Sequence, residues 1–196
     1  MTAAGIFAWC LYDFANSAFP TVVITFVFSA YFVRGVAADV EAGTAAWAHA
    51  MALAGLATAV LGPVLGAVAD RSGRRKPWIL LFSVVCIAAG GALWFVRPDP
   101  SYMMLGLVLA VVAAIAFEVA TVFYNAMLPD LVPAGRIGRW SGWAWGIGYL
   151  GGLLCLVVAL FGLVMTPTPL FGLDKATSEH VRAVAPLTAL WFAVFS

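Results

Sequence analysis

The chain has 196 residues, of which 64% are hydrophobic and 10% are charged, and its formal net charge at pH 7 is +1. A typical soluble domain has about 45–50% apolar and about 25% charged residues, so this chain cannot cover a water-exposed surface with polar groups. Such a composition excludes intrinsic disorder, and the small net charge argues against nucleic-acid binding. The remaining class is an all-α membrane protein that crosses the bilayer several times.

Long apolar runs predict where the chain crosses the membrane. The hydrocarbon core is about 30 Å thick, so a spanning helix needs about 20 apolar residues. Five runs are long enough, whereas the sixth has roughly 14 residues and would measure about 21 Å as a helix. The expected spans are residues 5–33, 46–69, 77–96, 102–127, 141–165 and 183–196. We expect the sixth span to be incomplete and residues 1–196 to be the N-terminal part of a longer protein.

The charges between these runs predict the orientation of the chain. With the N-terminus in the cytoplasm, the inside loops carry six basic residues, and the outside loops carry four basic and five acidic residues. Basic residues favour the cytoplasmic side, and the dense cluster at 71–76 is hard to translocate. We therefore expect a multi-pass integral membrane protein with its N-terminus inside. The Ala-, Gly- and Arg-leaning composition suggests a prokaryotic cytoplasmic membrane.

Cysteine and histidine residues give no sign of a metal site. The three cysteines, at positions 10, 86 and 155, lie far apart, and neither a CxxC nor an HExxH pattern occurs. These patterns are the usual signals of zinc sites and disulfide frameworks. No Ser/His, His/Asp or metal cluster lies within a span, which argues against a membrane-embedded enzyme. We expect no catalytic residue, no metal and no cofactor.

Two acidic residues, Asp13 and Glu118, lie inside the predicted spans. An acid at membrane depth is costly and usually faces a cavity or a partner. Polar residues at helical offsets share the face of each acid: Asn16, Ser17, Pro20 and Thr21 in the first span, and Thr121 and Asn125 in the fourth. Both acids lie about 12–14 Å from the same membrane surface. The pair could share one cavity and bind a proton or a substrate ammonium, or each neutral carboxyl could bond to another helix.

The loop after the second predicted span has a specific pattern. Its sequence from Gly66 to Lys76, GAVADRSGRRK, resembles the GxxxDRxGRR loop between helices two and three of the major facilitator superfamily. If only its positive charge matters, the loop could instead serve merely to keep this end of the chain in the cytoplasm. The resemblance implies a conformational lock that holds one access state, formed by Gly66, Asp70, Arg71, Gly73, Arg74 and Arg75.

Further stretches resemble one branch of this superfamily, the vacuole-effluxer-like transporters, which include autophagy-related amino-acid effluxers. They are YDFANSAF at 12–19, FYNAMLPDL at 123–131, GRWSG at 138–142 and GIGYLGG at 146–152. The superfamily has twelve helices in two halves, each built from 3+3 inverted repeats. The resemblance therefore implies an N-terminal six-helix bundle with its sixth helix truncated, in which spans one and four occupy equivalent positions.

The function implied by the resemblance is secondary active transport of a small solute by alternating access. An amino acid is one candidate substrate, and a proton or ion gradient would supply the energy because the sequence has no ATP-binding P-loop. The expected partners are the lipid bilayer, the small-molecule substrate and the missing C-terminal half, with no nucleic acid. The residues expected to bind substrate or ion are Asp13, Asn16, Glu118, Thr121, Tyr124 and Asn125.

A second function from a different class stays open, namely a non-transporting membrane scaffold or assembly partner. In that case the polar faces of the first and fourth spans would make hydrogen bonds between helices. An Asp13→Asn substitution in the longer protein distinguishes the two functions, because a transporter should lose flux with normal insertion and a scaffold should lose assembly.

Overall fold

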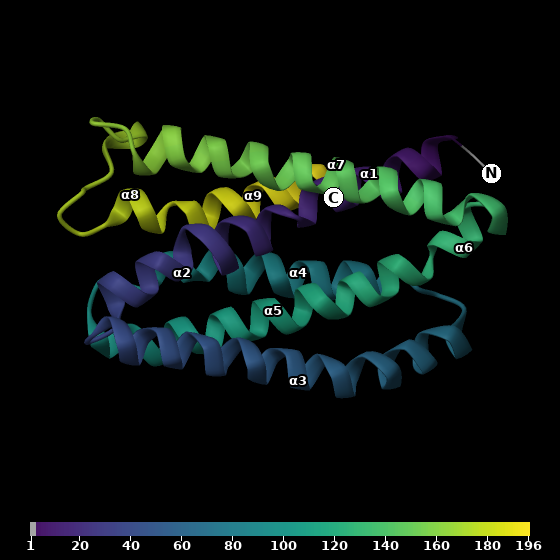
Figure 1. Ribbon diagram of the computed structural model, residues 1–196, viewed down its shortest axis with the longest axis horizontal. Helices are drawn as coiled ribbons and strands as arrows, with labels where there is room; N and C mark the ends of the chain where they lie inside the picture. The colour runs from purple at the N-terminus through teal and green to yellow at the C-terminus, as the bar shows by residue number, and fades with distance from the viewer. Residues whose placement is uncertain (1–2) are drawn as a thin grey trace.

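The computed structural model describes residues 3–196, apart from the side chains of residues 3, 69, 70, 72 and 170. All regular structure in this part of the chain is helical, and five helical runs are long and apolar enough to cross a membrane. They are Ala4–Val36, Val40–Val68, Lys76–Phe95, Pro100–Leu131 and Ala134–Val164. The runs lie roughly along one axis (Figure 1). This arrangement confirms the predicted all-helical membrane bundle.

Each run contains one main helix, and short turns extend most of them. The main helices and the two short helices α2 and α6 are α1 (Ala3–Asn16), α2 (Phe28–Tyr31), α3 (Val40–Ser72), α4 (Lys76–Ala92), α5 (Met103–Ala126), α6 (Leu128–Leu131) and α7 (Ile137–Ala159). The chain then continues through α8 (Glu179–Arg182) to α9 (Val184–Phe195), which has 12 residues. The start of α1, the α3–α4 connection and α6 lie at one end of the bundle (Figure 1), which we call the basic end.

The first span is not a continuous α-helix. Between α1 and α2 it adopts π-helical geometry over η1 (Phe19–Phe26), and Pro20 lies at the start of this segment. Proline has no backbone N–H and cannot continue the α-helical ladder. Thr21 Oγ1 donates to the Ser17 carbonyl and Thr25 Oγ1 to the Pro20 carbonyl, both at 2.8 Å. The threonine hydroxyls thus satisfy backbone groups in a region where lipid offers no hydrogen bonds.

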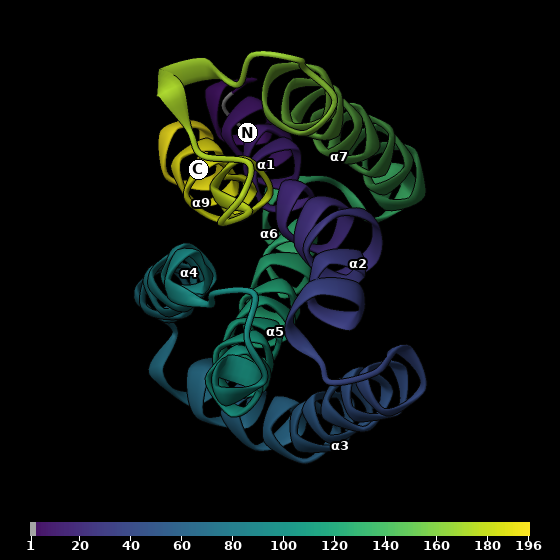
Figure 2. The ribbon, with the colours of Figure 1, turned by 90° about the vertical axis from the view of Figure 1, so that its left-hand side faces the viewer.

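The helices pack as two linked groups. Viewed along the bundle, α5 lies between α3 and α4, and α1 lies between α7 and α9 (Figure 2). Contacts between α4 and α9 join the groups on one side, and the first span joins them in the middle. This topology places the first span at the centre, where it can contact the other helices.

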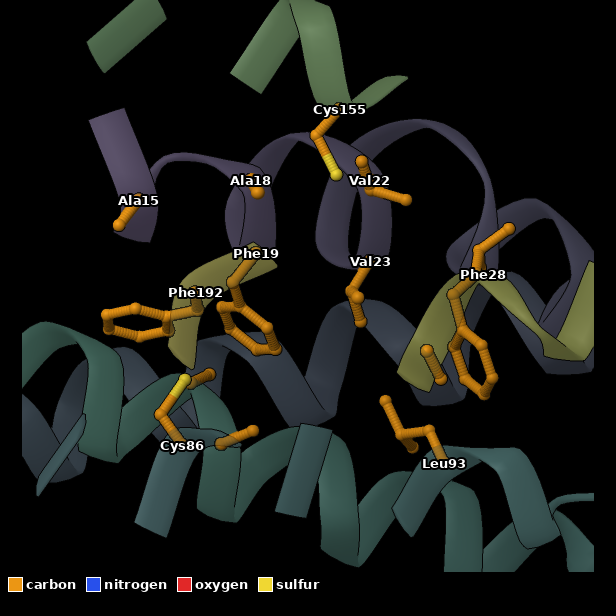
Figure 3. Packing of buried hydrophobic residues seen from close by; sticks show 14 of the residues in the cluster. Ala15, Ala18, Phe19, Val22, Val23, Phe28, Cys86, Leu93, Cys155 and Phe192 are labelled. Carbon is orange, nitrogen blue, oxygen red and sulfur yellow. The ribbon is translucent and has the colours of Figure 1, made fainter. Parts of the chain in front are cut away.

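The buried core follows this central span. Phe19, Val23 and Phe28 point from the first span toward Cys86 of α4 and Leu93, which directly follows α4 (Figure 3), and each is at most 2% exposed. Lipid tails are as apolar as these side chains, so close packing rather than removal from water holds membrane helices together. The core therefore fixes how the first span sits against its neighbours, including the polar face that carries Asp13.

A buried hydrogen bond also ties α1 to α4. The Tyr12 and Ser83 hydroxyl oxygens lie 2.8 Å apart and both residues are buried. We expect Ser83→Ala to lower the free energy of unfolding by about 1 kcal/mol, because the Tyr12 hydroxyl loses its partner. Equilibrium unfolding in mixed micelles measures this change. Ser141→Ala is the control, since the Ser141 hydroxyl makes no side-chain hydrogen bond in the described part of the chain. Equal losses in both variants would contradict the prediction.

Candidate functional site

The polar face of the first span lies against α7. A Cβ atom added to Gly148 would lie 2.5 Å from Asp13 Oδ2 and 2.8 Å from Ser17 Oγ, and one added to Gly152 would lie 2.6 Å from Thr21 Oγ1. Asp13, Ser17 and Thr21 are spaced by four residues, so they follow one side of the helix. Glycines on α7 make room for these three polar groups. Asp13 itself is half-buried.

Asn16 and Tyr124 are buried deeper, between the two groups of helices. Asn16 is 2% exposed, and its Oδ1 accepts a 3.5 Å hydrogen bond from Ser17 Oγ. The Tyr124 ring stacks on Trp9 and Tyr12 with centroid distances of 4.5 and 5.1 Å, and Trp9 Nε1 donates to the Tyr124 carbonyl. The Tyr124 hydroxyl is buried and has no hydrogen-bond partner among the described residues. Such an unsatisfied group could accept or donate a hydrogen bond to a bound molecule.

The predicted polar face of the fourth span is more open. Glu118 and Asn125 are exposed on α5, whereas Thr121 is half-buried and its hydroxyl donates to the Phe117 carbonyl at 2.9 Å. Among the described residues, no hydrogen bond joins Glu118 to Asp13.

Both acids nevertheless lie in the same layer of the bundle. Two ring contacts between the first span and α5 bracket this layer, namely Trp9 with Tyr124 and Phe19 with Phe117. Asp13 lies between Trp9 and Phe19 along the first span. On α5, Glu118 lies between Phe117 and Tyr124. The structure therefore brings the acids to a similar depth on different faces.

A cavity of about 300 Å³ opens next to Tyr124, between α1, α4 and α5. This volume is at the lower limit of about 300 Å³ for small-molecule pockets. Its lining combines aromatic, hydroxyl and basic side chains, including Trp9, Tyr12, Lys76, Ser83 and Tyr124. Aromatic faces with a few polar groups are typical of sites for small organic molecules.

Arg75 links three elements at the basic end. Its Nη1 donates to the Ala126 carbonyl at 2.7 Å and pairs with Asp130 Oδ2 at 2.5 Å. Arg75 precedes α4, Ala126 ends α5 and Asp130 lies in α6. A positive charge at the end of α5 also complements the negative end of its helix dipole. Asp130 was not among the predicted site residues, although it lies in the FYNAMLPDL stretch.

The other predicted lock residues lie around this link. Gly66 is half-buried in α3 beside a cavity of about 660 Å³ that Arg75 also lines. Arg71 and Arg74 are exposed. The side chain of Asp70 lies outside the described part of the structure. Gly73 has a φ of +64°, in the left-handed region that favours glycine.

The left-handed turn at Gly73 leads to a direct prediction. A Cβ atom at this position would meet nothing within 4 Å, but a non-glycine residue in this conformation costs roughly 1–2 kcal/mol. We expect Gly73→Ala to lower the free energy of unfolding by that amount. Gly138→Ala is the control, because Gly138 also faces open space and has no positive φ. Unfolding titrations of both variants measure the difference, and an unchanged Gly73→Ala protein would contradict it.

The opposite end of the bundle has a polar cluster that sequence reasoning missed. Arg182 is 5% exposed, its Nε donates to the Trp94 carbonyl at 2.9 Å, and its guanidinium carbon lies 4.7 Å from the centre of the Trp94 ring. The Tyr31 hydroxyl donates to the nearby Val96 carbonyl. From the sequence, Arg182 is only one of the four basic residues of the outside loops, because no spacing pattern relates residues 88 positions apart.

Burial lowers the pKa of the His180 imidazole below its usual range, and the charge of Lys175 acts in the same direction. A lowered pKa disfavours the protonated, positively charged form of this side chain.

The helical bundle, with five runs long and apolar enough to cross a bilayer, is that of a multi-pass integral membrane protein. The family model described as Vacuole effluxer Atg22 like matches residues 36–196, and the chain belongs to this family. The chain is 29% identical over 192 residues to the "Uncharacterized MFS-type transporter YxiO" of Bacillus subtilis (strain 168). The match covers 96% of the chain and 44% of that relative. No solved structure matches the chain. These matches confirm the resemblance to the vacuole-effluxer-like branch.

Proposed function

We propose that the chain forms the N-terminal half of a secondary active transporter, which moves a small solute by alternating access and uses a proton or ion gradient. One observation carries this proposal. The Asp13 carboxyl is half-buried within a span, and in the described part of the chain no hydrogen bond or ion pair engages it. An intramembrane acid without an internal partner is suited to bind a proton, a metal cation or an ammonium group.

An amino acid is the substrate class that this site suits best. Its ammonium group would meet a carboxylate, Asp13 or Glu118, and its side chain would meet the aromatic layer of Trp9, Tyr12 and Tyr124. The unsatisfied Tyr124 hydroxyl offers a further hydrogen bond. The family description, a vacuole effluxer, supports export from a compartment or cell as the direction.

The Arg75 link supports a conformational lock at the basic end. An ion pair and a helix-end hydrogen bond hold α4, α5 and α6 together through one side chain. Alternating access requires contacts that form in one state and break in the other. We place the basic end in the cytoplasm, as the positive-inside rule favours, and the bacterial relative supports a prokaryotic cytoplasmic membrane.

A non-transporting scaffold is the second candidate, and one observation favours it. Asp13, Ser17 and Thr21 pack against glycines of α7, which is how polar residues hold membrane helices together. Under this alternative, Asp13 would be needed for assembly and no solute would cross the membrane.

Transport by the full-length protein tests the proposal. Proteoliposomes are loaded with a mixture of amino acids and small metabolites, a pH gradient is applied, and mass spectrometry identifies the compounds that move. We expect gradient-dependent movement of at least one compound, absent from liposomes without protein and from proteoliposomes with a collapsed gradient. Correctly inserted protein that moves nothing from an extended panel would favour the scaffold. Solute movement at the same rate with and without every gradient tested would contradict secondary active transport.

A further inference from the structure

The glycines of α7 that face the first span have different neighbours. A Cβ atom on Gly151 would run into the backbone of Phe14, whereas one on Gly148 would meet the Asp13 carboxyl and the Ser17 hydroxyl. Gly146, two residues earlier, has nothing within 4 Å of its Cβ position. Packing of the two backbones explains the glycine at 151. At 148 the neighbouring atoms are the ends of side chains, which could turn away from a larger residue.

The position of the Asp13 carboxyl is set by its close fit against the backbone of Gly148 on α7. Among the described residues it has no hydrogen-bonding or ionic partner, yet Oδ2 and Cγ lie 2.5 and 2.9 Å from the Cβ position of Gly148. The carboxyl therefore rests over the α-carbon of Gly148, in space that any other residue would fill. Ser17 Oγ lies beside the same point. The surface of α7 thus determines where this acid presents its oxygens.

We infer that Gly148 is a positioning residue for the Asp13 carboxyl, an inference that rests on the proposed role of Asp13 in binding a cation, a proton or an ammonium group. A methyl group at 148 forces the carboxyl to rotate away from α7, since its oxygen cannot stay 2.5 Å from a carbon atom. The oxygens then leave the position that they occupy over Gly148, from which they would meet a bound cation or ammonium group. The fold remains, because the flexible carboxylate rather than the backbone yields.

This inference distinguishes Gly148 from a residue that only packs. A packing glycine affects stability, whereas a positioning glycine changes the affinity of the site at a similar stability. Gly146→Ala is the matched control, because Gly146 lies on the same helix, undergoes the same chemical change and faces open space.

The experiment compares Gly148→Ala and Gly146→Ala in the full-length protein. We expect Gly148→Ala to raise the half-saturating concentration of the transported amino acid, and that of protons, by about tenfold, with a smaller change in maximal rate. Gly146→Ala should match the wild type in both. Equal half-saturating concentrations in the two variants would overturn the inference.

A second readout does not depend on transport. Dicyclohexylcarbodiimide modifies protonated carboxyl groups in apolar surroundings, and peptide mass spectrometry quantifies its attachment to Asp13. We expect the rate of Asp13 modification to change severalfold in Gly148→Ala and to stay unchanged in Gly146→Ala. If no solute moves with the wild-type protein, the proposed function fails. The difference in Asp13 labelling between Gly148→Ala and Gly146→Ala still tests whether Gly148 positions the carboxyl.

A double substitution separates positioning from packing. In an Asp13→Ala background the carboxyl that the new methyl group displaces is absent. Gly148→Ala should then cause little further change in thermal stability, because only the Ser17 hydroxyl remains nearby. A loss of stability in this background larger than in the wild-type background would show that residue 148 acts mainly on the helix backbones, and would contradict the inference.

Discussion

Asp13→Asn in the full-length protein is expected to lower the transport rate about 10- to 100-fold at low substrate concentration without lowering the amount of inserted protein. Asparagine has nearly the same shape, so it keeps the fit against Gly148 and removes only the negative charge. Hydrogen bonds to charged groups contribute about 1.5–3 kcal/mol, which corresponds to about a 10- to 100-fold change in affinity. Flux into proteoliposomes at several substrate concentrations measures the loss.

Glu41→Gln is the control for the removal of a charge. Glu41 is exposed in the first turn of α3 and is not a candidate site residue, so we expect its variant to transport normally. Unchanged flux in Asp13→Asn would exclude Asp13 from the site. Loss of assembly or insertion together with flux would instead support the scaffold function.

The largest loss of stability is expected for Gly151→Ala. Its Cβ atom would overlap the carbonyl oxygen of Phe14 and lie 2.8 Å from the Phe14 Cα and carbonyl carbon. These are backbone atoms, so α1 and α7 must move apart along the whole contact. Overpacking of this kind costs roughly 1–3 kcal/mol and occasionally more, and we expect about 3 kcal/mol because the neighbouring glycine contacts open as well.

Unfolding in mixed micelles measures this loss, with Gly146→Ala as the reference. Alanine is the better helix former by roughly 0.5–1 kcal/mol, so Gly146→Ala should be neutral or slightly stabilising. A Gly151→Ala protein as stable as Gly146→Ala would mean that the two helices lie farther apart than in the structure.

Composition and run length were sufficient to predict the helical bundle. Lipid offers the backbone no hydrogen bonds, so a long apolar run has to become a helix, and no knowledge of its neighbours is needed. The spacing by four of Asp13, Ser17 and Thr21 also placed these residues on one face, and in the structure all three lie against α7. These properties are local, which is why sequence alone reveals them.

The neighbours of each face are not local and could not be predicted. Periodicity placed Asp13 and Glu118 on polar faces but did not show that glycines of α7 cover one face while the other is exposed. The bond from Arg75 to Asp130 crosses 55 positions, and that from Arg182 to Trp94 crosses 88. A proline disfavours regular α-helix at position 20, but its effect on the helix does not specify the π-helical form of η1, which depends on the packing around it.

The π-helical segment is a place where the two halves of the first span could rotate relative to each other. A π turn contains about one residue more than an α turn, and one residue corresponds to about 100° of rotation at 3.6 residues per turn. If η1 changed to α geometry, the half of the span that carries Asp13 would turn by about this angle relative to the half that carries Phe28. One half could then exchange its neighbours while the other kept its place, and the helix would not have to unwind.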